Sequence, residues 1–251
     1  MRFKLIFLPA LLLSAQAISA NIEEVKADDI ISRDVVAGDR TFSLPPGQWH
    51  VIARSKSNGT DVAGNPFPIR NVLLAQYKNN ELFAMVRVIS PLGDLSKFGR
   101  NGWKDDPCSN LKSVYMQDKL EGNYRLPECV YVRPVFGFGS SADSYWQDAM
   151  RRIQSAGVST PPLMVVVDYN YYRDGGFVHF SIWLNPEMAG VARDPALTAI
   201  DSKWNSENIQ GPYKNFADQA GSWAYRMAAA VKSSYNGNPQ PVPKLPYITV
   251  R

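Results

Sequence analysis

The segment "PPLMVVVDYNYYRDGGFVHFSIWL", residues 161–184, has the form of a long β-hairpin and so restricts the folds open to this chain. Two runs rich in β-branched and aromatic residues flank Asp174-Gly175, a dipeptide that favours a two-residue turn. Such a turn pairs Arg173 with Gly176 and thereby fixes the register of both strands. The sequence therefore predicts an antiparallel strand pair here.

This register divides the hairpin into two faces, because successive side chains of a strand point to opposite sides. The face predicted to meet the core contains Val165, Val167, Tyr169, Tyr171, Val178, Phe180, Ile182 and Leu184. The opposite face contains Asp168, Asn170, Tyr172, Phe177, His179, Ser181 and Trp183. On it, Asp168 lies across from Ser181 and Asn170 across from His179. A three-residue loop would instead place His179 opposite Tyr171 and separate these groups.

The polar face allows three interpretations. As a ligand site it would combine apolar platforms with polar groups, as sugar and peptide grooves do. The residues of that site would be Asp168, Asn170, Tyr172, Phe177, His179 and Trp183. As a catalytic site it would use Asp168, His179 and Ser181. It could also be an ordinary polar sheet face that contains some aromatic side chains, is exposed to solvent and binds no ligand.

The catalytic interpretation is the weakest of the three. Ser181 lies inside a regular strand, so its amide is committed to the sheet and no sharp turn supplies oxyanion donors. No G-x-S-x-G motif surrounds it. The sequence thus assigns no catalytic residue and favours binding over chemistry, with a hydrolase using Asp168 and His179 as the alternative.

Further strands are predicted before the hairpin. The segment "IRNVLLAQYKNNELFAMVRVIS", residues 69–90, reads as two strands around Asn79-Asn80, which tolerates the positive φ of a tight turn. Both of its faces are apolar, with Leu73, Tyr77, Leu82 and Val86 on one and Val72, Leu74, Phe83 and Met85 on the other. That pattern predicts a central position in a sheet covered on both sides. Residues 41–55 read as strand, Pro46-Gly47 turn and strand.

Helices are predicted at three places. One lies within residues 137–157: Ser141 or Asp143 caps its start, Trp146, Ala149, Met150 and Ile153 lie on one side, and Gly157 ends it. A short helix is expected after Asp194. The segment "YKNFADQAGSWAYRMAAAVKSSYNG" places Phe216, Ala220, Ala224, Met227, Ala228 and Val231 on one side.

Together these elements predict an α+β fold: an antiparallel β-sheet built from hairpins, with two or three helices packed on it. Residues 21–236 would form a single domain, and residues 237–251 a proline-rich C-terminal tail that runs extended.

The first 20 residues have the anatomy of a secretory signal peptide. Arg2 and Lys4 precede an apolar run that is too short to span a bilayer, and small residues follow it. Cleavage after Ala17 fits the small-residue rule, and cleavage after Ala20 is the alternative. No cysteine follows for lipid attachment and no other segment is long and apolar enough for a membrane anchor. A periplasmic or secreted, soluble product is predicted.

The two cysteines, Cys108 and Cys129, are predicted to form one disulfide, because an exported protein matures in an oxidising compartment. A bridge over this length should contribute about 3 kcal/mol. A metal site is not predicted, because the chain has no Cys-x-x-Cys and its histidines, His50 and His179, lie far apart.

Charge and motifs argue against nucleic acids and cofactors. Without Arg2 and Lys4, 25 basic residues face 23 acidic ones, a net charge of +2, and no basic cluster stands out. The stretch "GFGSSA", residues 137–142, matches a dinucleotide-binding pattern superficially, but Asp168 lies 31 residues from its first glycine where about 20 is expected. No cofactor is expected. The partner would be a small molecule, glycan, peptide or envelope protein.

Several of these features recur together elsewhere. The signal, "LPPGQW", two distant cysteines, the hairpin ending "WLNPEMAG" and the helix "WAYRMAAAVKSSYNG" resemble a loose group of exported proteobacterial proteins to which no activity is assigned. The strand "LPPGQW" with a sheet and a closing helix is also similar to the Mog1/PsbP-like accessory proteins. The resemblance implies a bacterial envelope location and an accessory role, and it transfers no catalytic residue.

Overall fold

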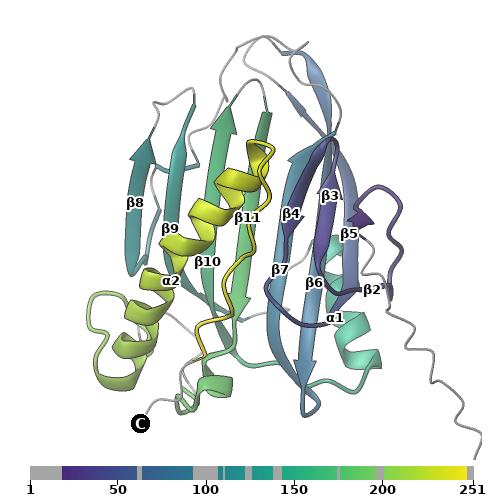
Figure 1. The fold of residues 1–251 in the computed structure, drawn as a ribbon. Coiled ribbons are helices and arrows are strands. Elements are labelled where there is room, and N and C mark those ends of the chain that lie inside the picture. Colours follow the sequence, from purple (N-terminus) through teal and green to yellow (C-terminus); the bar gives the residue numbers. More distant parts are fainter. Residues whose placement is uncertain are drawn as a thin grey trace, which may run out of the picture.

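Two β-sheets and two α-helices make up the described part of the chain (Figure 1). The computed structural model describes residues 19–60, 64–92, 107–109, 111–121, 126–137, 143–173, 176–194, 196 and 201–247. The strands are β1 (Ala20–Asn21), β2 (Ile30–Ile31), β3 (Asp34–Ala37), β4 (Arg40–Ser43), β5 (Trp49–Thr60), β6 (Pro66–Lys78), β7 (Glu81–Pro91), β8 (Met116–Glu121), β9 (Glu128–Phe136), β10 (Leu163–Arg173) and β11 (Gly176–Leu184). The helices are α1 (Ser144–Ser155) and α2 (Gly211–Tyr235), and a 3₁₀ turn spans Pro186–Ala189.

The larger sheet has eight strands in the order β2-β5-β6-β7-β11-β10-β9-β8, and every neighbouring pair is antiparallel. Strands β5 to β7 form one run of hairpins, and β8 to β11 form another. The two runs join where β7 pairs with β11. The small sheet has the order β1-β3-β4.

Both faces of the large sheet are covered (Figure 1). On one face lie α2 and the small sheet, and α2 contacts β4, β9 and β10. On the other face lies α1, which contacts β5. The α+β prediction is confirmed in this coarse form, but the sheet dominates and the two helices lie on opposite faces.

The helices follow their predicted patterns. The Asp143 side chain caps α1 by accepting the Tyr145 amide, and Ala149, Met150 and Ile153 are buried beneath it. Ser141, the other predicted cap, lies outside the described residues. All six residues predicted for the apolar side of α2 are buried. The short helix expected after Asp194 falls largely on residues 195 and 197–200, which are outside the described part, and residues 201–204 form turns.

The hairpin of β6 and β7 has the predicted turn, since Asn79 and Asn80 both have positive φ, at 53° and 59°. The predicted division of its side chains into faces is wrong. A bulge shifts the register after Gln76, which pairs with Ala84 while Tyr77 pairs with Leu82. Phe83 is therefore an extra residue, and the faces that alternation predicts are exchanged on one side of it.

The segment around Pro46-Gly47 links the two sheets. Gly47 has the expected positive φ, at 141°, but β4 and β5 belong to different sheets and do not pair with each other. The fully buried Trp49 donates its indole N–H to the Pro45 carbonyl at 2.8 Å and so holds the link against the core.

The chain ends differ in what can be described. The predicted signal spans residues 1–20, of which residues 1–18 lie outside the described residues, and Ala20 belongs to β1. Residues 237–247 have no regular structure but pack against the domain, with Val242 2% exposed and the Trp223 indole donating to the Lys244 carbonyl. Within the described residues, no helix has the length and apolar character needed to cross a membrane.

Candidate functional site

The hairpin of β10 and β11 has the predicted register. Arg173 pairs with Gly176, Asp168 with Ser181 and Asn170 with His179. The turn residues Asp174 and Gly175 themselves lie outside the described part. The register confirms that two residues separate the strands and that the polar side chains share one face.

Asp168 is the centre of a hydrogen-bonded cluster on that face. Its Oδ1 lies 3.0 Å from His179 Nε2 and accepts the Ser181 hydroxyl at 2.5 Å. Its Oδ2 lies 3.5 Å from Arg133 Nε on β9. The Asp168 side chain is 3% exposed, whereas those of His179 and Arg133 are 24% and 38% exposed. The carboxylate is therefore buried behind partners that reach solvent.

These partners keep Asp168 ionised. Burial by itself raises the pKa of this carboxyl, but hydrogen bonding and charge interaction with His179, assisted by Arg133 and Ser181, hold the pKa below its ordinary value. Next to it, burial raises the pKa of Tyr131, whose hydroxyl interacts with Asp168 and Asn170. The site thus contains a carboxylate anion whose charge is balanced locally.

The arrangement differs from a serine-hydrolase triad. Ser181 Oγ lies 3.0 Å from His179 Nε2, the same nitrogen that faces Asp168. A triad histidine uses one ring nitrogen for the acid and the other for the serine. Here Ser181 donates its proton to Asp168, so the histidine is not placed to remove it.

A second polar group lies beside this cluster. Arg87 of β7 pairs directly with Ser181, and its Nε donates to Asn71 Oδ1 at 3.1 Å. Asn71 also accepts the Tyr145 hydroxyl from the first turn of α1 at 2.8 Å. The Arg87 guanidinium lies 5.6 Å from the ring centroids of Tyr145 and Trp146. The start of α1 thus holds a second cation on the same face.

The predicted ligand-binding residues lie on one face, but five of the six are buried. Asp168 and Asn170 are 2% exposed, Tyr172 6%, Phe177 4% and Trp183 7%. Tyr172 and Phe177 stack with each other and pack against Phe67, and Trp183 packs against Trp146. The interpretation as a solvent-exposed polar face does not hold for these five residues, and the aromatic ones are covered by α1 and Phe67. His179 is the member of the set that keeps substantial exposure.

The predicted disulfide is confirmed between Cys108 and Cys129, with Cα atoms 5.8 Å apart. Cys129 pairs with Asn170 across β9 and β10, so the bridge adjoins the site. The bridged segment also contains β8, a strand the sequence did not predict, because four of its six residues are polar or charged and hide the strand pattern.

Sequence reasoning missed Arg87, Arg133, Asn71 and Tyr145. A usable signal existed for the two arginines, since each interrupts an otherwise apolar strand, in "AMVRVIS" and "CVYVRPVF". Asn71 and Tyr145 gave no such signal. Among the described residues, no group of three His, Cys, Asp or Glu side chains could hold a metal ion.

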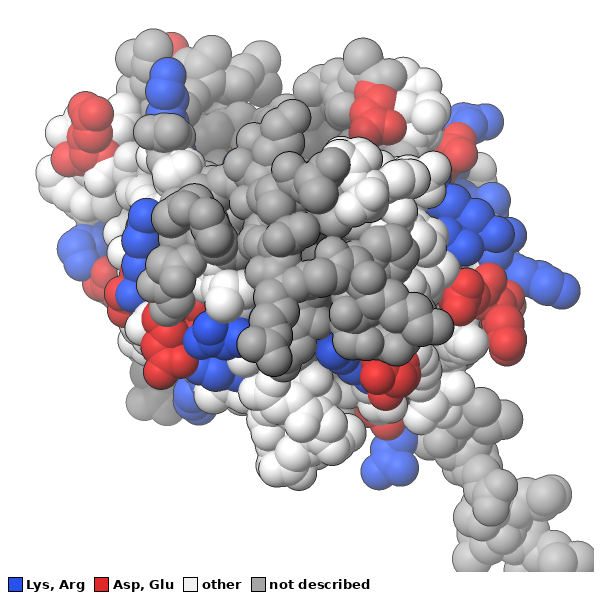
Figure 2. Space-filling model, turned by 90° about the horizontal axis from the view of Figure 1, so that it is seen from above, with Lys and Arg blue, Asp and Glu red and all other residues white. Residues whose placement is uncertain are grey.

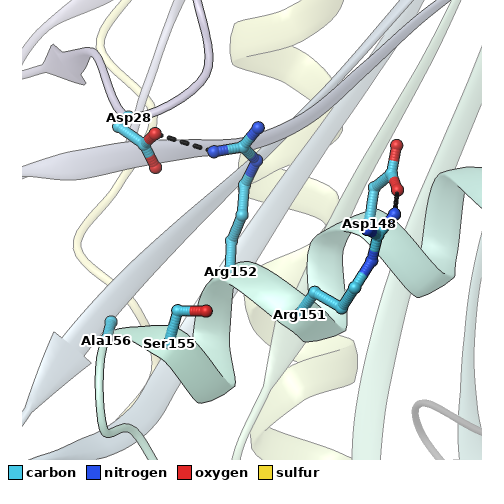
Figure 3. A pocket seen from close by; sticks show the side chains of 6 residues that line it. All are labelled: Asp28, Asp148, Arg151, Arg152, Ser155 and Ala156. Atoms are coloured by element: carbon cyan, nitrogen blue, oxygen red, sulfur yellow. Dashed lines mark hydrogen bonds and ion pairs between the residues drawn. The ribbon is translucent and has the colours of Figure 1, made fainter.

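Two pockets lie away from this cluster. One, of about 650 Å³, is lined by Asp28 and by Asp148, Arg151, Arg152, Ser155 and Ala156 of α1 (Figure 3). Its charges are satisfied internally, since Arg152 reaches Asp28 at 2.7 Å and Arg151 turns away toward Asp148. The other, of about 570 Å³, lies between α2 and β8 and is lined by Tyr115, Met116, Ala217, Asp218, Gly221, Ser222 and Tyr225.

Surface charge shows no large patch of one sign on the face seen in Figure 2. There, the Lys and Arg side chains of the described residues are interspersed with Asp and Glu. Such a mixture gives no one-sided basic surface of the kind that nucleic-acid binding uses.

Comparison of the chain with protein-family models, with curated proteins and with solved structures finds no match. We therefore infer the function from the geometry of the Asp168 cluster.

Proposed function

We propose that this chain is an exported accessory or ligand-binding protein of the bacterial envelope that acts without chemistry of its own. The observation that carries the proposal is the layering of the Asp168 cluster. The carboxylate is buried and both of its oxygens have partners, while the Arg133 and His179 side chains that it orients are partly exposed. A site of this kind presents oriented polar groups to a ligand and lacks an activated nucleophile.

Export is supported by two features. The N-terminal segment has the form of a signal peptide, and the Cys108–Cys129 disulfide is typical of oxidising compartments such as the periplasm. The resemblance to exported proteobacterial proteins and to Mog1/PsbP-like accessory proteins agrees with this location and with a partner that is a small molecule, a glycan, a peptide or an envelope protein.

The alternative is an envelope hydrolase. It is favoured by the mutual closeness of Asp168, His179 and Ser181, whose polar atoms lie within 3.0 Å of one another. The shared histidine nitrogen argues against it, because proton transfer from the serine would need a different geometry.

The experiment is a thermal-shift screen of the purified exported form against glycans, peptides and metals, repeated with His179→Ala. A ligand that binds the native state raises the melting temperature. We expect a hit whose shift decreases in His179→Ala but not in His50→Ala, since His50 stacks on Tyr77 away from the cluster.

One result would contradict the proposal, and another would narrow it. A hydrolytic activity that His179→Ala lowers by about 100-fold or more would show that the protein is an enzyme. Absence of any shift across a broad library would favour a partner protein over a small-molecule ligand.

A further inference from the structure

We propose that the ligand carries an oxyanion, a carboxylate or a phosphate, which the Arg133 guanidinium and the His179 imidazole bind from the two sides of Asp168. This inference rests on the proposed binding function and names the chemistry of its ligand.

The two groups are close enough to act together. Arg133 Nε lies 3.5 Å from one oxygen of Asp168, and His179 Nε2 lies 3.0 Å from the other. Both of these nitrogens are engaged by Asp168, so a ligand would use the terminal nitrogens of Arg133 and the other ring nitrogen of His179. A small oxyanion has two or more oxygens and can accept from both groups.

The exposed part of Arg133 is free to bind. Among the described residues, no partner hydrogen-bonds to its terminal nitrogens, and the side chain is 38% exposed. A guanidinium offers its donors in a planar fork that matches carboxylate and phosphate oxygens. Asp168 contacts its Nε and so fixes its orientation.

The charge around Asp168 also favours an anion. Two guanidinium groups, Arg87 and Arg133, lie on the face of the sheet that holds the Asp168 carboxylate. The acidic residues Asp118, Glu121 and Glu128 of the neighbouring strands instead contact α2 on the opposite face. An anion bound at Arg133 therefore lies on the face opposite to these three carboxylates.

His179 has one ring nitrogen left for the ligand. Its Nε2 faces an Asp168 oxygen, which can only accept, so Nε2 carries a proton. In the imidazolium form Nδ1 donates as well, and this is the form that binds an oxyanion.

Cationic and neutral ligands fit less well. A cation would need a free acidic oxygen, but both oxygens of Asp168 are occupied and buried. A neutral sugar needs donors and acceptors in balance, whereas arginine offers donors alone.

The test measures binding of three probes by calorimetry: inorganic phosphate, D-glucuronate and D-glucose. We expect phosphate, glucuronate or both to bind, and glucose to bind more weakly than glucuronate. Binding of phosphate alone would identify a phosphate ligand and binding of glucuronate alone a carboxylate ligand, and either supports the proposal.

Variants distinguish anion binding at Arg133 and His179 from a general electrostatic attraction of anions to the protein. Arg133→Gln and His179→Gln should each weaken anion binding about tenfold or more, because a charge-assisted hydrogen bond is lost. Arg151→Gln, which removes an exposed, ion-paired arginine on α1, should leave it unchanged. Unchanged circular dichroism and melting temperature identify the variants that fold normally. Arg133→Lys is a second, conservative change, and this variant should retain part of the anion binding.

The outcomes distinguish the two proposals. Equal anion binding by Arg133→Gln and Arg151→Gln overturns the inference. A second result also overturns the inference: the thermal-shift screen yields a neutral ligand that binds through His179, while phosphate and glucuronate neither bind nor compete with it. The proposed binding function would remain valid in that case.

Discussion

Asp168 shows how one buried residue can organise its surroundings. Both of its oxygens are engaged, by His179 and Ser181 on one side and Arg133 on the other. Such a residue is costly to leave without partners, since a buried charge stays ionised only when it is paired. The three partners are therefore held in place by a carboxylate that solvent does not reach.

The lowered pKa of Asp168 should make the native state sensitive to acid. Burial opposes ionisation, but the interactions with His179 and Arg133 outweigh it and hold the pKa below the ordinary 3.8. This contribution to the free energy of unfolding is complete above the ordinary value and is lost as the pH falls through the lowered pKa. In Asp168→Asn, the free energy of unfolding should depend less steeply on pH below 3.8, and at neutral pH it should be lower by about 1–3 kcal/mol. Urea denaturation over a pH series measures both effects, and parallel curves for the two proteins would contradict the assignment.

Local sequence predicts the cross-strand pairs of the hairpin, but not how deeply its side chains are buried. The pairings of Asp168 with Ser181 and Asn170 with His179 follow from the spacing around one turn. The burial of Trp183 beside α1 and of Tyr172 and Phe177 beside Phe67 depends on distant parts of the chain, which leave no trace in residues 168–183.

At the scale of elements, α2 is attached to the sheet by polar as well as apolar contacts. Lys232 Nζ lies 2.9 Å from Glu128, an acid that is 3% exposed and also accepts the Tyr169 hydroxyl at 2.8 Å. The same lysine contacts the exposed Glu121 at 2.8 Å. If α2 moved away from β9, the buried Glu128 carboxylate would lose its contact with the Lys232 cation.

Lys232→Met should therefore destabilise the protein by about 3 kcal/mol, because it leaves the buried Glu128 carboxylate without its cation. The matched control is Lys214→Met on the same helix, where the pair with Asp218 is exposed on both sides. That variant should change the free energy of unfolding by about 0.5 kcal/mol or less. Urea denaturation compares the two, and similar losses in both variants would refute the role of Glu128.

The elements differ in how well their sequence predicts them. The apolar side of α2 was predicted fully, because helical spacing is a local property. The faces of β6 and β7 were not, because a single extra residue at Phe83 exchanges the two covered faces of the sheet. β8 escaped prediction because its residues alternate between intermediate and exposed without apolar regularity.

At the scale of the whole molecule, the large sheet consists of two runs of hairpins that meet along β7 and β11. The disulfide ties Cys108 to β9 in the second run and closes a loop that contains β8. The fold class was predictable because hairpins and amphipathic helices are visible in the sequence. The order of the strands was not, because the pairing of β7 with β11 joins residues about 90 positions apart, for which local patterns give no signal.

Removing the disulfide should cost about 3 kcal/mol, since the unfolded chain regains the freedom of the closed loop. The double variant Cys108→Ser/Cys129→Ser tests this by urea denaturation, without and with a reducing agent. The reducing agent should destabilise the wild-type protein to the level of the variant and leave the variant unchanged. Equal stability of both proteins under oxidising conditions would contradict the prediction.

The Asp168 cluster lies within three neighbouring strands, with Arg133 on β9, Asp168 on β10 and His179 on β11. A ligand that contacts both Arg133 and His179 would therefore connect the two strands that flank β10. Occupancy would consequently resist the separation of these three strands during unfolding.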